Sequence, residues 1–304
     1  EISLGLVGSE MCIRDSYTPL ESTNILLNGW IPYQTIASRL YARSGYYQSG
    51  GAYGFRDQLQ DTLGVRYLEP EFMKNQIIKH SEHQFLEGDV EHWWHEETGR
   101  GIRTKFSDDL LWLVYLTIKY IEFTGDNSIL DIETKYLSGE ILQEGQDEKY
   151  DLFKQSDVSE SIYEHCIRAI EKSLNFGEHG LPKIGSGDWN DGFSTVGNKG
   201  NGESIWLGFF LYTILDGFIP IIKERENDGN ENENVIEEKI KLSEKYEKIK
   251  QDLKRALNTS GWDGRWYKRA YMDDGNILGS MAVSYTHLTL PTTLGCRSRW
   301  SPYH

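Results

Sequence analysis

The segment DLLWLVYLTIKYIEF, residues 109–123, constrains the fold of this chain more than any other. It is apolar on almost every face of a helix, so other elements have to cover it on most sides. Residues 203–215 (ESIWLGFFLYTIL) form a second segment of this kind. The chain therefore needs at least two layers of helices, with the apolar ones inside.

Two further segments have the pattern of the outer layer. Residues 161–174 carry apolar residues near one face, and Ser161 with Glu164 predicts a capping box at the start of that helix. Residues 236–257 are amphipathic, with an apolar stripe and Lys/Glu elsewhere. Strand signals are few. The sequence therefore predicts a large all-α domain in concentric layers.

Bulk properties exclude some functions. A net charge of −15 disfavours nucleic acid, whose phosphates need a basic surface. The longest apolar run, residues 205–222, contains Asp216 and Pro220, which predicts a buried helix with a break rather than a membrane span. The three cysteines, Cys12, Cys166 and Cys296, have neither metal nor disulfide spacing, which favours a reducing, cytoplasmic compartment.

The two ends differ in composition from the middle. Residues 1–16 and 284–304 have no clean helical or strand period, and both resemble translated sequencing-adapter read-through. On this interpretation Cys12 and Cys296 carry no meaning, and residues 17–283 are a fragment of the natural protein. The alternative is that both ends are ordinary disordered termini.

The strongest chemical motif is GSGDWNDG, residues 185–192. Asp188 and Asp191 lie either side of Trp189, between glycines that allow a close backbone approach to a ligand. An indole stacks on the face of a sugar ring, and a carboxyl group held protonated can act as a general acid. A structural turn is the competing interpretation, whereas a calcium loop would need alternating oxygen ligands and a distal Glu.

Polar residues also gather in residues 46–61 and 91–109. Arg56, Asp57 and Asp61 predict either a clamp on sugar hydroxyls or a structural ion-pair network. His92 and His95, three residues apart, would share one face of a helix, but the HExxH pattern is absent and we expect no metal.

Cleaving a glycosidic bond needs an acid on the departing oxygen and a nucleophile at the anomeric carbon. Hydrolases commonly use a second carboxylate, whereas a phosphorolytic enzyme uses inorganic phosphate as its nucleophile. Asp191 lies in a distinct Gly-rich loop, and the sequence has no clear second loop that would supply another catalytic carboxylate. The motif therefore leans towards phosphorolysis.

Five ordered blocks carry a family resemblance. They are ARSGYYQSGGAYGFRDQLQD, EGDVEHWWHEETGRGIRTKFSDDLLWL, YEHCIRAIEKSL, GLPKIGSGDWNDG and GESIWLGFFL. They resemble glycoside hydrolase family 94, formerly glycosyltransferase family 36. Their sequence is most similar to that of the β-1,2-glucan branch, which is the phosphorylase-like domain of cyclic β-1,2-glucan synthases.

The resemblance implies that residues 17–283 are a partial catalytic domain, an incomplete (α/α)6 barrel of an inverting phosphorylase that leaves some apolar helix faces uncovered. The enzyme would split a β-glucoside, either β-1,2-glucan or a cellobiose-like one, with phosphate to give α-glucose 1-phosphate, with phosphate as co-substrate and no cofactor. By motif, Asp191 matches the general acid, Trp189 the wall of the donor-sugar pocket, and Arg56 and Asp61 the residues that bind donor hydroxyls. Asp57 and Asp188 would support their loops. Further cleft residues with no assigned role would be His92, Trp93, Trp94, His95, Arg103 and Asp108.

The family's phosphate-binding residues lie beyond the point where the resemblance stops, so the fragment itself is expected to be inactive. Relatives in the family form dimers, which makes a homodimer possible, and a glucan synthase parent could be membrane-associated. Two alternatives stay open: an inverting hydrolase on the same barrel, and a non-catalytic carbohydrate-binding fragment.

Overall fold

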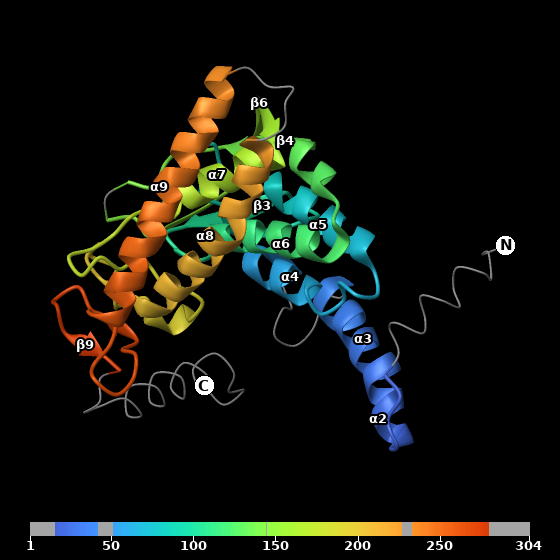
Figure 1. The fold of residues 1–304 in the computed structure, drawn as a ribbon. Coiled ribbons are helices and arrows are strands. Elements are labelled where there is room, and N and C mark those ends of the chain that lie inside the picture. Colours follow the sequence, from blue (N-terminus) through green and yellow to red (C-terminus); the bar gives the residue numbers. More distant parts are fainter. Residues whose placement is uncertain (1–15, 42–50, 144, 227–232, 280–304) are drawn as a thin grey trace.

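The computed structural model describes residues 16–41, 51–143, 145–226 and 233–279 (Figure 1). Nearly all of both predicted tails, with Cys12 and Cys296, lies outside these residues. Residues 46–50 of the first polar cluster also lie outside them, as do residues 227–232.

The helices of the main body form an inner row and an outer row. The inner helices pack side by side in the order α4 (Phe55–Thr62), α6 (Asp109–Thr124) and α8 (Ile205–Glu226). Their outer sides are covered by α5 (Pro70–Ser81), α7 (Ile162–Ser173) and α9 (Glu233–Asn258). The predicted alternation of apolar inner helices with amphipathic outer helices is confirmed for α6, α7, α8 and α9.

The prediction of an all-α fold is not confirmed, because three small sheets accompany the helices. The largest has the order β1-β2-β3-β5 and contains β1 (Ala52–Gly54), β2 (Glu91–His95), β3 (Arg100–Thr104) and β5 (Glu148–Asp151). β4 (Glu133–Ser138) pairs with β6 (Lys154–Ser161), and the third sheet joins β7 (Glu203–Ser204), β8 (Ala270–Tyr271) and β9 (Ile277–Leu278). All of these pairs are antiparallel.

Sequence signals mark the start of the outer helix α7 and the end of the inner helix α6. The side chain of Ser161 accepts a hydrogen bond from the backbone of Glu164 at the start of α7, as the capping motif predicts. α6 ends at Gly125, whose φ of 71° is the left-handed conformation that glycine adopts most easily.

The helix α8 continues through Pro220, so the predicted break is wrong. Proline removes one backbone hydrogen bond, but Ile219 and Ile221 on either side are buried, and α8 packs against both α6 and α9. This contact surface holds the last turns of the helix together. Residues Ile205–Arg225 also form one helix that is long and apolar enough to cross a membrane, and its place between α6 and α9 is typical of a core helix.

A helical arm precedes the body and extends away from it (Figure 1). It consists of α2 (Glu21–Ile25), η1 (Leu26–Trp30), α3 (Ile31–Gln34) and η2 (Thr35–Tyr41). Large apolar side chains on it are exposed, among them Ile25, Trp30 and Tyr33. This agrees with the expectation that some apolar helix surface is left uncovered.

Burial along α8 gives a direct test of the layered core. Phe218 is fully buried and stacks on Tyr163 of α7, whereas Phe209 on the same helix is 38% exposed. We expect Phe218→Ala to lower the free energy of unfolding by about 3–5 kcal/mol, because it leaves a cavity between layers. The matched control Phe209→Ala should cost about 1 kcal/mol or less. Urea unfolding measures both, and equal losses would contradict the assignment of α8 to the inner layer.

Candidate active site

The N-termini of the three inner helices meet at one end of the body. Arg56 lies in the first turn of α4, Asp108 is the N-cap residue of α6, and Ser204 immediately precedes α8. Helix N-termini carry unpaired N–H groups and partial positive charge, which favours carboxylates there. The predicted loop, residues 185–192, reaches this same end.

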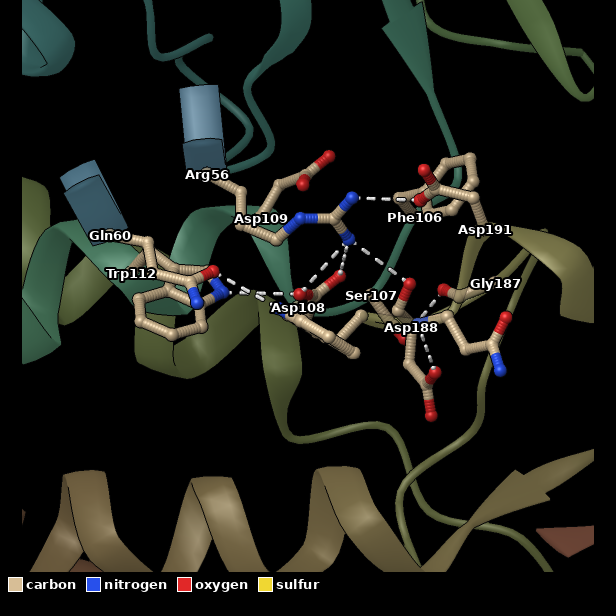
Figure 2. Close-up of polar contacts among 12 residues, drawn as sticks. Arg56, Gln60, Phe106, Ser107, Asp108, Asp109, Trp112, Gly187, Asp188 and Asp191 are labelled. Carbon is tan, nitrogen blue, oxygen red and sulfur yellow. Dashed lines mark hydrogen bonds and ion pairs between the residues drawn. The ribbon is translucent and has the colours of Figure 1, made fainter. Parts of the chain in front are cut away.

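Arg56 lies at the centre of the site (Figure 2). Arg56 is 6% exposed. The two terminal nitrogens of its guanidinium contact three residues from two other parts of the chain. One nitrogen, Nη1, lies 3.4 Å from both carboxylate oxygens of Asp108 and donates to the backbone carbonyl of Asp188 at 3.2 Å. The other, Nη2, donates to Asp191 Oδ1 at 2.7 Å. One side chain therefore connects α4, the start of α6 and the acidic loop.

The loop approaches α6 because its glycines permit it. Gly185 has a φ of 60°, and a Cβ at this position would lie 2.1 Å from the carbonyl oxygen of Lys105. Phe106 forms bridges with Gly185 and Gly187, and the Ser107 hydroxyl donates to the Gly187 carbonyl at 3.1 Å. Any side chain at position 185 would push the loop away from its support.

Asp188 is fully buried and supports the loop, as predicted. Its carboxylate accepts from Arg269 Nη2 at 2.7 Å, from the Ser204 hydroxyl at 2.6 Å and from the backbone of Asn190 at 3.0 Å. The Ser204 hydroxyl also accepts from the backbone of Leu207, in the first turn of α8. Asp188 therefore fixes the loop to the N-terminus of α8.

Asp191 and Trp189, in the loop that Asp188 supports, have side chains that remain accessible to solvent. Asp191 opens the short helix η4 (Asp191–Phe193), and its side chain is 31% exposed. Trp189 is 49% exposed, and its indole N–H donates to Gln60 Oε1 of α4 at 3.0 Å. An exposed indole thus lies two residues from a partly exposed carboxyl group.

Asp61 lies farther along α4 than Arg56. Five positions separate the two residues, so their side chains leave the helix in different directions. The Asp61 carboxylate accepts from Arg39 Nε of the helical arm at 2.7 Å. The structure therefore brings Arg56, Trp189 and Asp191 together, and it places Asp61 at the junction of α4 with the arm.

Behind Arg56 lies a buried acidic pair, Asp108 and Asp109. Burial, with the neighbouring carboxylate of Asp109, raises the pKa of Asp108 to about 7, although Arg56 and the indole of Trp112 favour its ionised form. The Asp109 carboxylate pairs with His92 Nδ1 at 2.6 Å. Burial opposes a charge on His92, but this carboxylate raises the pKa of His92 above its usual value.

His92 and His95 both belong to strand β2, so they do not share the helix face that a metal site of this spacing would need. Residues three apart on a strand leave from opposite faces. His92 stacks on Phe106 and joins the site, whereas His95 contacts Trp93. Among the described residues, no group of three or more His, Cys, Asp or Glu is placed to hold a metal ion.

Two other predicted cleft residues, Arg103 and Trp94, are buried and hold the fold together. Arg103 is 1% exposed, pairs with Asp89 and Glu87, and lies over the ring of Phe85. Trp94 is also buried, with His83 stacked on it at 3.7 Å. Both hold the β2–β3 hairpin to the body.

A cavity of about 420 Å³ adjoins the start of the loop. It is lined by Gly185, Ser186 and several lysines, but by none of the four predicted site residues. The site of Asp191 is therefore not part of this cavity.

Sequence reasoning missed Gln60 and Arg269. Gln60 is one turn beyond Arg56 on α4, so the helical period alone would place the two on one face. Arg269 lies in the short β-structured segment after α9, where no motif marks it. Only the fold shows its contact with Asp188.

The fold and the site together give a helical domain in which an exposed indole lies beside a paired carboxyl and guanidinium, an arrangement that suits the face and hydroxyl groups of a sugar. Comparison with known proteins agrees. The model of the glycosyl hydrolase 94 superfamily, catalytic domain, matches residues 13–295. The chain therefore belongs to the glycoside hydrolase 94 family.

Named relatives include synthases and phosphorylases. The chain is 41% identical over 267 residues to the cyclic beta-(1,2)-glucan synthase NdvB of Rhizobium meliloti, covering 86% of this chain and 9% of that protein. It is 30% identical over 264 residues to solabiose phosphorylase of Paenibacillus borealis, covering 86% of this chain and 29% of that protein. The N,N'-diacetylchitobiose phosphorylase of Vibrio furnissii is 24% identical over 294 residues. The chain spans less than a third of the length of these relatives.

The raised pKa of Asp108 predicts a pH dependence of stability. Its pKa is 3.8 in the unfolded reference and about 7 in the fold, so between these values the native protein binds more protons than the unfolded chain. The contribution of Asp108 to the free energy of unfolding therefore falls as the pH rises from about 4 to about 7, by at most about 1.4 kcal/mol per unit.

Urea unfolding of the wild type and of Asp108→Asn across this range checks the prediction. The wild type should lose stability relative to the variant as the pH rises. Asp252→Asn on the exposed face of α9 is the control and should show no such trend. A constant difference between wild type and Asp108→Asn would contradict a raised pKa at this position.

Proposed function

We propose that this chain is part of an inverting β-glucoside phosphorylase, with β-1,2-linked glucan as the first substrate to test. On this proposal residues 17–283 are part of an (α/α)6 barrel, and the three packed helix pairs are the described portion. The observation that carries the proposal is the pairing of Asp191 with Arg56 beside the exposed indole of Trp189, at the N-termini of α4, α6 and α8. The names of the phosphorylase relatives support it.

The proposed roles follow from position. Asp191, partly exposed on a supported loop, would donate its proton to the glycosidic oxygen. Trp189 would form a wall against one face of the donor sugar. Arg56, and Asp61 farther along α4, would bind the hydroxyl groups of that sugar.

The contact between Arg56 and Asp191 bears on how the sugar would bind. Nη2 of Arg56 donates to Asp191 Oδ1, whereas Nη1 donates to the Asp188 carbonyl and lies 3.4 Å from Asp108. The donor sugar would take over Nη2, while Nη1 stays on Asp108 and the Asp188 carbonyl. Binding of the sugar would in this way release the Asp191 carboxyl towards the glycosidic oxygen.

The choice between phosphate and water rests on the other carboxylates. Asp108 and Asp109 are both buried and engaged with Arg56, Trp112 and His92, so neither is placed to activate a water molecule. An external anionic nucleophile, inorganic phosphate, removes the need for a second carboxylate. The residues that bind it would belong to the parent protein beyond the matched blocks. Dimerisation, a cytoplasmic location and membrane association of the parent stay predictions.

One observation favours hydrolysis as the second candidate. Asp57 is an accessible carboxylate, with its side chain 42% exposed and Oδ1 4.0 Å from Arg56 Nε. In an inverting hydrolase such a group would activate water. Asp57→Asn separates the candidates, because it would abolish hydrolysis but leave phosphorolysis largely intact.

We expect the parent protein to release glucose 1-phosphate from β-1,2-glucooligosaccharides only when phosphate is present. Asp191→Asn should lower the rate on the order of 10²–10⁴-fold, because it removes the proton donor. Asp252→Asn serves as the control. Glucose released without phosphate, or an Asp191→Asn variant with wild-type rates, would contradict the proposal.

A further inference from the structure

Arg269 touches the acidic loop on both sides of Asp191. We infer that it is a positioning residue, which holds the segment Asp188–Phe193 in one conformation and so sets where the Asp191 carboxyl lies. The structural part of this inference stands on contacts alone. Its effect on the reaction rests on the proposed function.

The first contact is an ion pair before Asp191 in the chain. Arg269 Nη2 donates to Asp188 Oδ1 at 2.7 Å, and Nη1 donates to the Ser204 hydroxyl at 3.2 Å. Asp188 is fully buried and the Arg269 side chain is 16% exposed, so solvent screens this pair little. Since the same carboxylate oxygen accepts from the backbone of Asn190, the pair also fixes the residue next to Asp191.

The second contact lies after Asp191. The guanidinium carbon of Arg269 is 4.6 Å from the centre of the Phe193 ring, within the range of a cation–π interaction. Phe193 is 4% exposed and packs with Ile184, Val196 and Leu278. One planar side chain therefore holds an aspartate three residues before Asp191 and a ring two residues after it.

Arg269 is itself fixed by backbone contacts. Its N–H donates to the carbonyl of Leu278 at 2.9 Å, and its carbonyl accepts from the N–H of Ile205, the first residue of α8. The next residue, Ala270, pairs with Ser204 in the small sheet. The backbone that carries this guanidinium is therefore attached to the N-terminus of the inner helix α8, and not to the loop.

This arrangement complements Arg56. Arg56 contacts the carboxyl of Asp191 directly, and the proposed mechanism requires it to change partner when a sugar binds. Arg269 holds the backbone on either side and touches neither the sugar site nor the carboxyl in these contacts. It would keep Asp191 in place while Arg56 is engaged elsewhere, and misplacement by about 1 Å can lower a rate about 10²-fold.

Hydrogen–deuterium exchange on the chain as it stands tests the structural part. Arg269→Met keeps most of the side-chain length but removes the charge and the planar fork. We expect exchange to be at least about tenfold faster in residues 188–193, with that of α6 and α8 unchanged. Arg269→Lys, which keeps the charge but not the fork, should give an intermediate increase.

Arg168→Met is the matched control. Like Arg269, Arg168 pairs with a carboxylate and lies over an aromatic ring, but its partners are Glu160 and Tyr136 and it belongs to α7. It should leave exchange in residues 188–193 unchanged. Wild-type exchange there in Arg269→Met and Arg269→Lys, or an equal increase in Arg168→Met, would overturn the inference.

A kinetic measurement on the parent protein tests the catalytic part. Arg269→Met should lower kcat about 10²-fold with little change in KM, because the sugar-binding groups remain. An unchanged kcat would overturn the positioning role. If the wild-type parent shows no phosphorolysis at all, the proposed function fails, while the exchange result still decides whether Arg269 holds the loop.

Discussion

A single buried guanidinium, that of Arg56, connects the parts from which the site is built. It comes from α4 and pairs with the N-cap residue of α6, with the backbone of the acidic loop and with the Asp191 carboxyl. A charge this deeply buried is costly unless it is paired and hydrogen-bonded. The surrounding carboxylates meet that requirement. Removing them would leave an uncompensated charge, so the positions of α4, α6 and the loop depend on one another.

The helix termini explain why carboxylates gather at this end. Asp108 and Asp188 are both fully buried, beside the N-termini of α6 and α8 respectively. Positive partial charge at those termini and the two arginines Arg56 and Arg269 offset their desolvation. At Asp108 the desolvation is not fully offset, because burial raises the pKa of this residue to about 7. Asp191, in contrast, is 31% exposed at its side chain, with Oδ1 2.7 Å from Arg56 Nη2.

Periodicity predicted the helices whose apolar pattern is strong, α6, α7, α8 and α9, because burial on one or all faces decides their place. It missed β2 and β3, since the residues 91–104 are rich in Trp, His and Arg and have no clean alternation. It also placed a break at Pro220, where packing on both sides of α8 outweighs one lost hydrogen bond. For the site, the family resemblance grouped Arg56 with the loop residues Trp189 and Asp191, and the structure shows Arg56 in contact with Asp191, while their roles stay predictions. The contacts of Arg269 and Gln60 were not predicted, because they join segments 81 and 129 positions apart in the chain, respectively.

The two arginines divide one requirement between them. The proposed proton donor, Asp191, has to be accurately placed and also able to turn its carboxyl towards a bound sugar. The backbone of its loop is held by Arg269 through Asp188 and Phe193, and not through Asp191 itself. Arg56 contacts the Asp191 carboxyl through Nη2, and its Nη1 stays on Asp108 if that contact is exchanged. The position of the loop and the contact of its carboxyl are then set by different side chains, so the loop can be rigid while the Asp191 carboxyl changes partner.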